Sequence, residues 1–215
     1  MQMTQVFEKG DQGMTSIRIA ILAMLTFVGG AAGQSPAQSD WPCKQVRVPE
    51  IAIGGLWNGP AIDGESRNWR NDGPVADLVS RIRQRRTPLD DAEKSIADFA
   101  RAAGAERKAR LTRLFAGTYE SMNDERREVI NGLDRFGRRL KDLAEITRQG
   151  SEELRNLQDQ KPVDPEAIRK ASETLQWRLR VFDEQRRMAS YVCESPALIE
   201  QRLGALARAI AREIN

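Results

Sequence analysis

The chain has 215 residues and a formal net charge of +3, because 34 lysines and arginines slightly exceed 31 aspartates and glutamates. Its 40% hydrophobic content argues against disorder, and 30% charged with only 6% aromatic residues favours an α-helical surface over a β-sandwich. The absence of histidine excludes Ser-His-Asp and Cys-His catalytic arrangements and most zinc or copper sites.

An uncharged apolar run occupies residues 19–33, directly after Arg18, and it ends in small residues. This order is typical of a secretory signal peptide, whereas a membrane span needs about 20 apolar residues. We therefore predict that residues 1–33 are a signal peptide, cleaved before Gln34 or before Asp40. Met14 is a better candidate than Met1 for the translation start, because a short, positively charged segment follows it. An uncleaved N-terminal membrane anchor is the alternative. Both interpretations place residues 34–215 in the periplasm or outside the cell.

Residues 34–73 are predicted to form an irregular arm, because proline or glycine interrupts them every few positions. Three of the four tryptophans lie here: Trp41, Trp57 and Trp69. A segment without its own core needs large side chains to hold it against the rest of the protein, so we favour packing across a helical body. The alternative is an aromatic contact surface for a partner.

The two cysteines, Cys43 in the arm and Cys193 near the C-terminus, are predicted to form a disulfide, because exported chains retain few free thiols. A reactive or partner-linking thiol is the alternative, and it would need an electropositive, exposed setting. The bond would hold the arm to the far end of the fold, so we expect reduction to loosen residues 41–69 before the rest unfolds.

Helical periodicity begins at Pro74 and continues to the C-terminus in amphipathic segments. The predicted helices cover residues 74–82, 88–103, 105–122, 124–158, 165–193 and 195–215. Small and polar residues predict a loosening at 117–123, and Gly150-Ser151 is a candidate bend. Three X-Pro pairs, at Pro88, Pro165 and Pro196, predict helix starts.

The two longest segments are predicted to form a helical hairpin that turns at residues 161–165, where Asp164 caps the second helix. In the first, residues on one face alternate at spacings of four and three, as in a coiled coil: Val129, Leu133, Phe136, Leu140, Leu143, Thr147, Gly150, Leu154 and Leu157. The second carries Ile168, Ala171, Leu175, Leu179, Phe182, Ala189 and Val192. The predicted fold is an all-α antiparallel bundle over residues 74–215, with a homodimer through the same seam as an alternative.

The densest basic run holds Arg81, Arg83, Arg85 and Arg86, within a segment 81–113 that has ten basic and five acidic residues. These arginines are candidates for binding an anionic lipid, an envelope polyanion or an acidic partner. A solvated helix face with nearby counter-charges is the competing interpretation. We expect no nucleic-acid partner, because the predicted signal exports the chain.

No spacing in the sequence indicates a catalytic site, a cofactor or a metal, and none is assigned. We therefore expect a non-enzymatic exported protein that binds another envelope protein as a scaffold, assembly factor or accessory subunit. Binding of a membrane surface or polyanion through the 81–113 face is the first alternative. A hydrolase based on Asp and Glu is the second.

Overall fold

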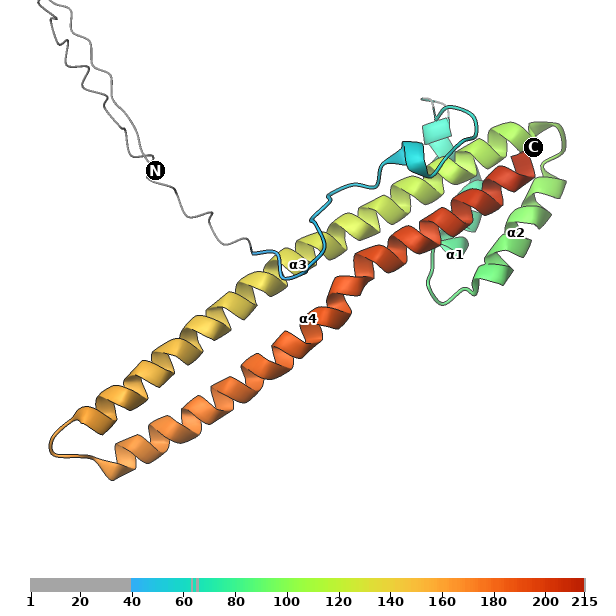
Figure 1. Cartoon of the computed structure of the whole chain (residues 1–215). Helices are drawn as coiled ribbons and strands as arrows, with labels where there is room; N and C mark the ends of the chain where they lie inside the picture. The colour runs from blue at the N-terminus through green and yellow to red at the C-terminus, as the bar shows by residue number, and fades with distance from the viewer. Residues whose placement is uncertain (1–39, 63, 65, 215) are drawn as a thin grey trace, which may run out of the picture. The chain divides into compact units, whose positions relative to one another are not determined.

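The computed structural model describes residues 40–62, 64 and 66–214, which are helical or irregular and include no strand. This part of the chain confirms the predicted all-α fold (Figure 1). In chain order its elements are the 3-10 turns η1 (Ile53–Gly55) and η2 (Ser66–Asn71), the helices α1 (Gly73–Ile82) and α2 (Leu89–Ala102), the turn η3 (Gly104–Glu106), and the long helices α3 (Arg107–Asp159) and α4 (Pro165–Ile214). The predicted signal peptide lies outside the described residues.

Helices α3 and α4 run antiparallel as a hairpin of 53 and 50 residues, each about 75–80 Å long at 1.5 Å per residue (Figure 1). The turn between them lies where the sequence predicts it. Asp164 caps α4, because its Oδ1 accepts hydrogen bonds from the backbone N–H groups of Glu166 and Ala167 at 3.0 and 3.1 Å. The predicted hairpin and its cap are therefore confirmed.

The predicted loosening at 117–123 is wrong, since α3 is continuous through it. Gly117 is small for a tertiary reason: a Cβ there would lie 2.6 Å from Cδ2 of Trp69 and 2.9 Å from Cγ2 of Val79. Gly150, which we considered a bend, also lies inside α3. A Cβ at this position would lie 2.9 Å from Nη1 of Arg178. Both glycines thus allow a close approach between elements instead of ending the helix.

The predicted helix start at Ser195-Pro196 is also wrong, because α4 continues through Pro196, which is buried. Proline has no N–H to donate to the carbonyl four residues earlier, so it weakens the local hydrogen-bond pattern. The arm contacts α4 one turn before the proline, since the Gln45 side-chain amide donates to the carbonyl of Cys193. Tertiary packing of the buried ring and the arm thus holds a helix that local rules would end.

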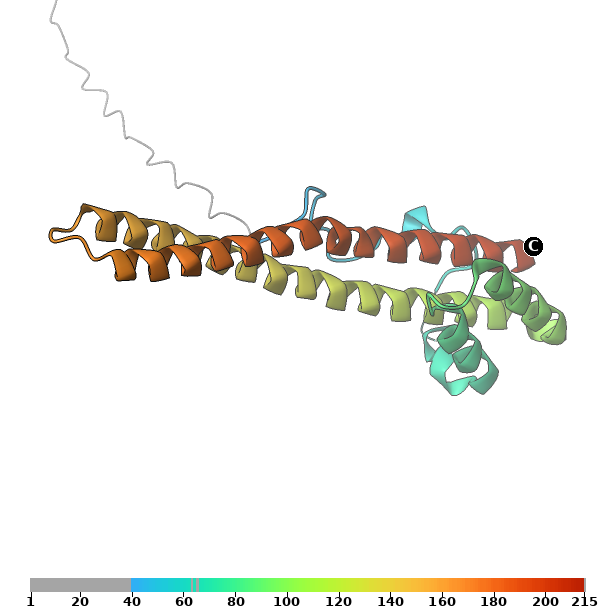
Figure 2. The ribbon, with the colours of Figure 1, turned by 90° about the horizontal axis from the view of Figure 1, so that it is seen from below.

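Helices α1 and α2 pack at the end of the hairpin opposite its turn, as Figures 1 and 2 both show. We call this end the body: α1, α2, the arm, residues 107–134 of α3 and 193–214 of α4. Its core is aliphatic with one fully buried phenyl ring, and its largest buried side chains include Leu78, Ile82, Ile96, Leu111, Phe115, Leu203 and Ile210. Gly104 ends α2 with a φ of +53°, the left-handed conformation expected of a C′ glycine.

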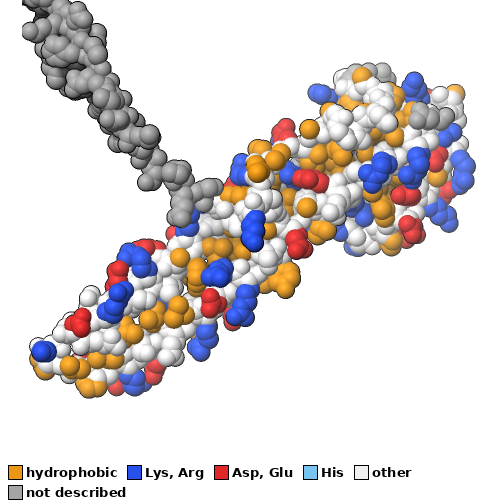
Figure 3. All heavy atoms as spheres, in the orientation of Figure 1, with side chains coloured by type: hydrophobic (Ala, Val, Ile, Leu, Met, Phe, Trp, Pro, Cys, Tyr) orange, Lys and Arg blue, Asp and Glu red, His pale blue; other side chains and the backbone are white. Residues whose placement is uncertain are grey.

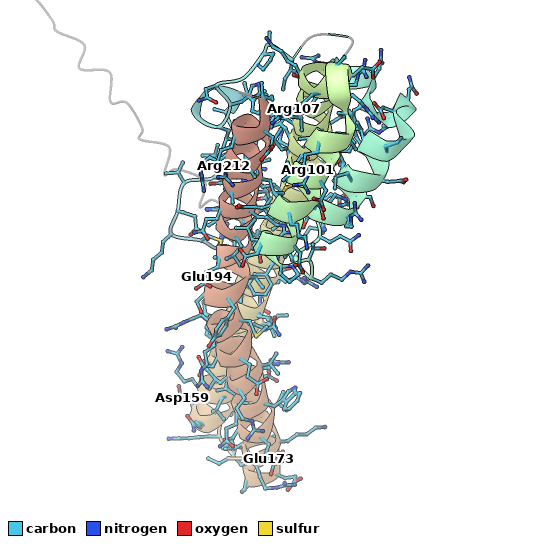
Figure 4. The ribbon with its side chains drawn as sticks, turned by 90° about the vertical axis from the view of Figure 1, so that its right-hand side faces the viewer. Arg101, Arg107, Asp159, Glu173, Glu194 and Arg212 are labelled. Atoms are coloured by element: carbon cyan, nitrogen blue, oxygen red, sulfur yellow. A yellow bond between two sulfur atoms is a disulfide. The ribbon has the colours of Figure 1, made fainter. Side chains whose placement is uncertain are left out.

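The remainder of the two long helices, residues 135–192, we call the distal hairpin; Figure 4 labels Asp159 and Glu173 near its turn and Arg107 and Arg212 at the opposite end. The predicted α3 seam is correct there, because all its members are buried or half-buried. On α4 the seam follows the same three-four spacing, and it places Arg178 instead of Leu179 against α3. Leu179 is 43% exposed, which corrects its predicted place on the packed face.

Candidate interaction surface

The predicted disulfide is present: Cys43 and Cys193 are bonded with their Cα atoms 5.5 Å apart. Two further contacts hold the same stretch of arm to α3. The Lys141 Nζ binds Asp40 Oδ1 at 2.7 Å, and this hydrogen bond is the main reason that the pKa of Asp40 lies below its usual value. The Asp40 backbone crosses α3 at Gly137, where a Cβ would collide with its carbonyl oxygen. The arm therefore lies along one edge of the α3–α4 seam.

Two of the three arm tryptophans fill the body. Trp69 is only 7% exposed, and its indole N–H donates to Glu120 Oε2 at 2.7 Å. Trp57 stacks on Phe115 with ring centroids 3.8 Å apart. Trp41 is half-buried, with its N–H bonded to the backbone of Gln45. Trp57 and Trp69 thus serve as packing anchors in the described residues, which leaves little of their surface for an external partner.

The four candidate arginines lie at the C-terminal end of α1 and in the turn that follows it. Arg83 and Arg85 approach Glu125 of α3 at 3.9 and 3.7 Å, and Arg86 donates to Gln84. The Arg202 guanidinium of α4 binds the carbonyl of Ile82, at the start of this turn. Arg81, the fourth, is exposed. The four arginines therefore lie close together in the structure, but Arg83 and Arg85 have an acidic neighbour in Glu125.

Other basic residues of 81–113 are also paired within the body. Arg110 binds Asp72 at 2.7 Å and Arg113 approaches it at 3.4 Å, while Arg107 binds Glu213 at 3.0 Å. The hydrogen bond from Arg110 holds the pKa of Asp72 below its usual value, against the opposing effect of burial. Nearby carboxylates therefore offset much of the excess positive charge that the sequence shows in residues 81–113.

The α3–α4 seam has two edges, and the contacts show what covers each edge in the body and at its border with the distal hairpin. The arm lies on one edge, through Gly137 of α3 and Cys193 of α4. The end of α1 lies on the other, where Arg83 approaches Glu125 of α3 and Ile82 accepts a hydrogen bond from Arg202 of α4, and α2 joins it there through the Glu93–Arg212 ion pair. In a coiled-coil seam, residues seven positions apart stay on the same edge. Counting along the helices therefore identifies the continuation of each edge in the distal hairpin.

The edge that α1 and α2 cover in the body continues uncovered in the distal hairpin. Seven-residue steps from Glu125 reach Ile146, and from Arg202 they reach Met188 and Val181. Beside them on α4, at the heptad position of Arg212, lie Tyr191 and Trp177. We call these residues the distal edge: Ile146, Trp177, Val181, Met188 and Tyr191.

Large apolar side chains of the distal edge are open to solvent. The exposed fractions are 61% for Trp177, 70% for Tyr191, 49% for Met188 and 42% for Ile146. Figure 3 shows one face of the hairpin, on which hydrophobic side chains lie between charged ones. Single exposed apolar residues are ordinary, but four along one edge of a helix pair, three on α4 and one on α3, are typical of an interaction surface.

The seam beneath the distal edge is thinly packed. Beyond Gly137, α3 buries only Thr147 and Gly150, and α4 buries no residue before Cys193. At the level of Gly150 the seam meets a charged side chain, Arg178. Two helices with so little buried apolar surface gain little stability from each other, since helical stability in proteins comes mainly from packing. The distal hairpin is thus a helix pair without a full core.

No protein-family model, curated protein or solved structure matches this chain. The class defined by the structure is therefore an all-α protein with a disulfide-anchored arm and a long helical hairpin. Within the described residues no helix is both long and apolar enough to cross a membrane.

None of the sequence patterns described above points to the distal edge. Trp177 and Tyr191 are fourteen residues apart, two heptads, and both lie outside the predicted seam. That spacing, in a chain with few aromatic residues, is the signal that could have found them. The arm also packs against Gly137 and Gly117, and nothing in the neighbouring sequence indicates this.

Proposed function

We propose that this protein is a non-enzymatic, exported helical protein that binds another envelope protein, as a scaffold, assembly factor or accessory subunit, through the distal edge. The observation that carries the proposal is the exposed apolar stripe on a helix pair that lacks a full core. A partner that covers Trp177, Met188 and Tyr191 would supply the burial that the hairpin lacks.

The proposed compartment is the periplasm or the outside of the cell. The Cys43–Cys193 bond supports it, since stable disulfides are typical of oxidising compartments. The apolar run at 19–33 supports it independently. Intact-mass measurement of protein from the envelope fraction should show loss of the first 33 or 39 residues. A full-length cytoplasmic product would contradict export.

A photo-crosslinking amino acid placed at position 177 in living cells tests the proposed surface. We expect it to capture an envelope protein, because residue 177 points outward on the distal edge. Position 179 is the matched control: Leu179 is also exposed and only two residues away, but it lies on the opposite edge. Equal capture from both positions, or none from 177, would contradict the proposal.

The other two candidate functions have weaker support. Binding of an anionic lipid or polyanion through Arg81, Arg83, Arg85 and Arg86 must compete with Glu125, which already lies beside two of them. Such binding should weaken steeply as salt rises, whereas an apolar interface should not. For an Asp/Glu hydrolase, no observation in the described residues argues in favour.

A further inference from the structure

We infer that two copies of this chain associate through their distal edges as an antiparallel homodimer, which covers the edge until the envelope partner binds. The inference rests on the proposed function and adds what covers the same surface when the partner is absent. Figures 1 and 2 show that α1 and α2 end before this part of the hairpin, which leaves the edge open within the described residues. The order of the charges along the edge identifies the occupant.

The charges around the distal edge are balanced in number. The edge and its rim carry five exposed basic and five exposed acidic side chains: Arg135, Arg139, Lys170, Arg180 and Arg187 against Asp142, Glu153, Glu173, Glu184 and Glu194. On the outer face of α3, Arg138, Glu145 and Glu152 lie further from the edge and pair within the chain. Glu173 also pairs, with Arg169. Whether two copies attract or repel each other thus depends on the order of these charges along the helices.

The Arg126–Glu200 ion pair sets the level at which α3 and α4 face each other. Eighteen residues further into the hairpin, residue 144 of α3 lies beside residue 182 of α4. A twofold axis that crosses the hairpin at this level would place two copies antiparallel, with α3 on α3 and α4 on α4. A residue a given number of positions before the centre then faces the residue the same number after it in the second copy.

Opposite charges meet in this arrangement. The pairs of opposite charge, each formed twice, are Arg135 with Glu153, Arg180 with Glu184, and Lys170 with Glu194. The other four charged residues face uncharged ones: Arg139, Asp142, Glu173 and Arg187 lie opposite Gln149, Ile146, Tyr191 and Trp177. None of the ten charged side chains faces a like charge. The charge pattern of the edge is therefore complementary to itself, which favours a second copy as the occupant.

The same residues disfavour a parallel dimer. A twofold axis along the hairpin would put α3 of one copy against α4 of the other at the same level. Arg139 would then face Arg187, and Glu153 would face Glu173. Like charges across an interface reduce affinity, so the charges select the antiparallel orientation.

The apolar residues and the size of the edge fit the antiparallel dimer. Val181 lies one residue from the centre, and Trp177 of each copy lies beside Met188 of the other, a favourable pairing of an aromatic ring with sulfur. The edge is about 27 Å long over residues 135–153 and about 20 Å wide, so the two faces together cover about 1,100 Å². This area is at the low end for a specific interface, so a partner could displace the second copy.

Analytical ultracentrifugation of the purified mature protein tests the inference. We expect a monomer–dimer equilibrium. Trp177→Ser should weaken dimerisation at least about tenfold, whereas Leu179→Ser on the opposite edge should leave it unchanged. Wild-type protein that stays monomeric at about 1 mM, or equal effects of the two variants, would overturn the inference.

A charge swap tests the register of the dimer. Arg135→Glu would put glutamate opposite Glu153, and Glu153→Arg would put arginine opposite Arg135, so each variant alone should dimerise at least about fivefold more weakly. An equimolar mixture of the two should dimerise as tightly as the wild type, because both facing pairs in the mixed dimer are again opposite in charge. Arg155→Glu, on the opposite edge of α3, is the control and should change nothing. A mixture no tighter than either variant alone would overturn the antiparallel register.

Crosslinking in cells separates the inference from the proposed function. The crosslinker at position 177 should capture both an envelope protein and a second copy of the chain. If it captures an envelope protein while the purified protein stays monomeric, the inference fails and the proposed function stands. If it captures only a second copy, the dimer stands and the proposed function fails.

Discussion

At the scale of single residues, Asp72 joins three parts of the body. Its carboxylate caps α1 by accepting the N–H of Val75 at 3.4 Å, and it binds Arg110 and approaches Arg113 on α3. The Asp72 side chain is 14% exposed and the Arg110 side chain 19%, so solvent screens this pair less than it screens a surface pair. The carboxylate therefore contributes both local helix stability and a tertiary contact.

The lowered pKa of Asp72 predicts a pH-dependent contribution to stability. Because its folded pKa lies below the unfolded value of 3.8, the contribution is present above pH 3.8 and is lost as the pH falls through the folded pKa. Asp72→Asn should reduce the free energy of unfolding at pH 7 by about 1–3 kcal/mol. The deficit should shrink in acid, as measured by denaturant unfolding at several pH values. A deficit independent of pH would contradict the assignment.

Two glycines of α3 offer a matched comparison of packing and helix propensity. Gly117→Ala would place a methyl group 2.6 Å from the Trp69 ring, and we expect a loss of about 1–3 kcal/mol. At Gly132 the nearest atom to an added Cβ is Nη2 of Arg135, 3.8 Å away, so alanine fits. Gly132→Ala should therefore stabilise the protein by up to about 1 kcal/mol. Thermal unfolding of both variants checks the pair, and equal effects would contradict this account.

At the scale of elements, the seam holds the hairpin together. Leu140 is half-buried between α3 and α4, and Leu140→Asp would put a charge there, so we expect a loss of about 2–4 kcal/mol. The neighbouring Lys141→Gln is the control. Lys141 binds Asp40, but both side chains are 40% exposed, so its replacement should change stability little. The free energy of unfolding of both variants is measured in urea. Equal values would contradict the packing of Leu140 in the seam.

The disulfide holds only part of the arm. Between Asp40 and Glu50 no side chain is fully buried, and besides the disulfide the arm is held there by polar contacts such as Lys141–Asp40 and Arg47–Asp134. From Ile51 onward it also has buried anchors. The Ile51 N–H donates to Asn123 and its carbonyl accepts the hydroxyl of Tyr119, and Trp57 and Trp69 pack in the body. From the sequence we expected reduction to loosen residues 41–69. Because of these contacts, we now expect it to loosen only residues 40–50.

Hydrogen exchange before and after reduction measures this release. Amides of residues 40–50 should lose protection in the reduced protein, while those of 51–69 should keep it. The bond spans 150 residues, so reduction should also lower global stability by as much as about 4–5 kcal/mol in the chain-entropy model. Loss of protection across the whole arm would show that its tryptophans do not anchor it independently.

At the scale of the whole described unit, stability should be uneven along the hairpin. The body buries the large core, and the distal hairpin buries only Thr147 and Gly150 beyond Gly137. Amides of 140–190 should therefore exchange faster than those of 107–130 and 196–212. Uniform protection along α3 and α4 would instead show that the two helices open as one unit.

The sequence by itself determined the features that depend on local chemistry. Apolar spacing located the long helices, and Asp164 and Pro165 located the turn. Two cysteines in a chain predicted to be exported indicated their pairing. These signals are short-range or follow from number alone, so no knowledge of neighbouring elements is needed. The predicted signal at 1–33 belongs to the same group and stays a prediction.

Only the tertiary structure decided whether Gly117 and Pro196 interrupt their helices. The Trp69 ring packs on Gly117 from a distant part of the chain, and Pro196 is buried in the fold. It also decided which apolar residues stay uncovered. Trp177 and Leu203 both occur on an amphipathic helix, yet one is 61% exposed and the other fully buried. The difference arises because α1 and α2 reach only the body end of the hairpin, and covering an edge depends on long-range packing that periodicity along one helix does not encode.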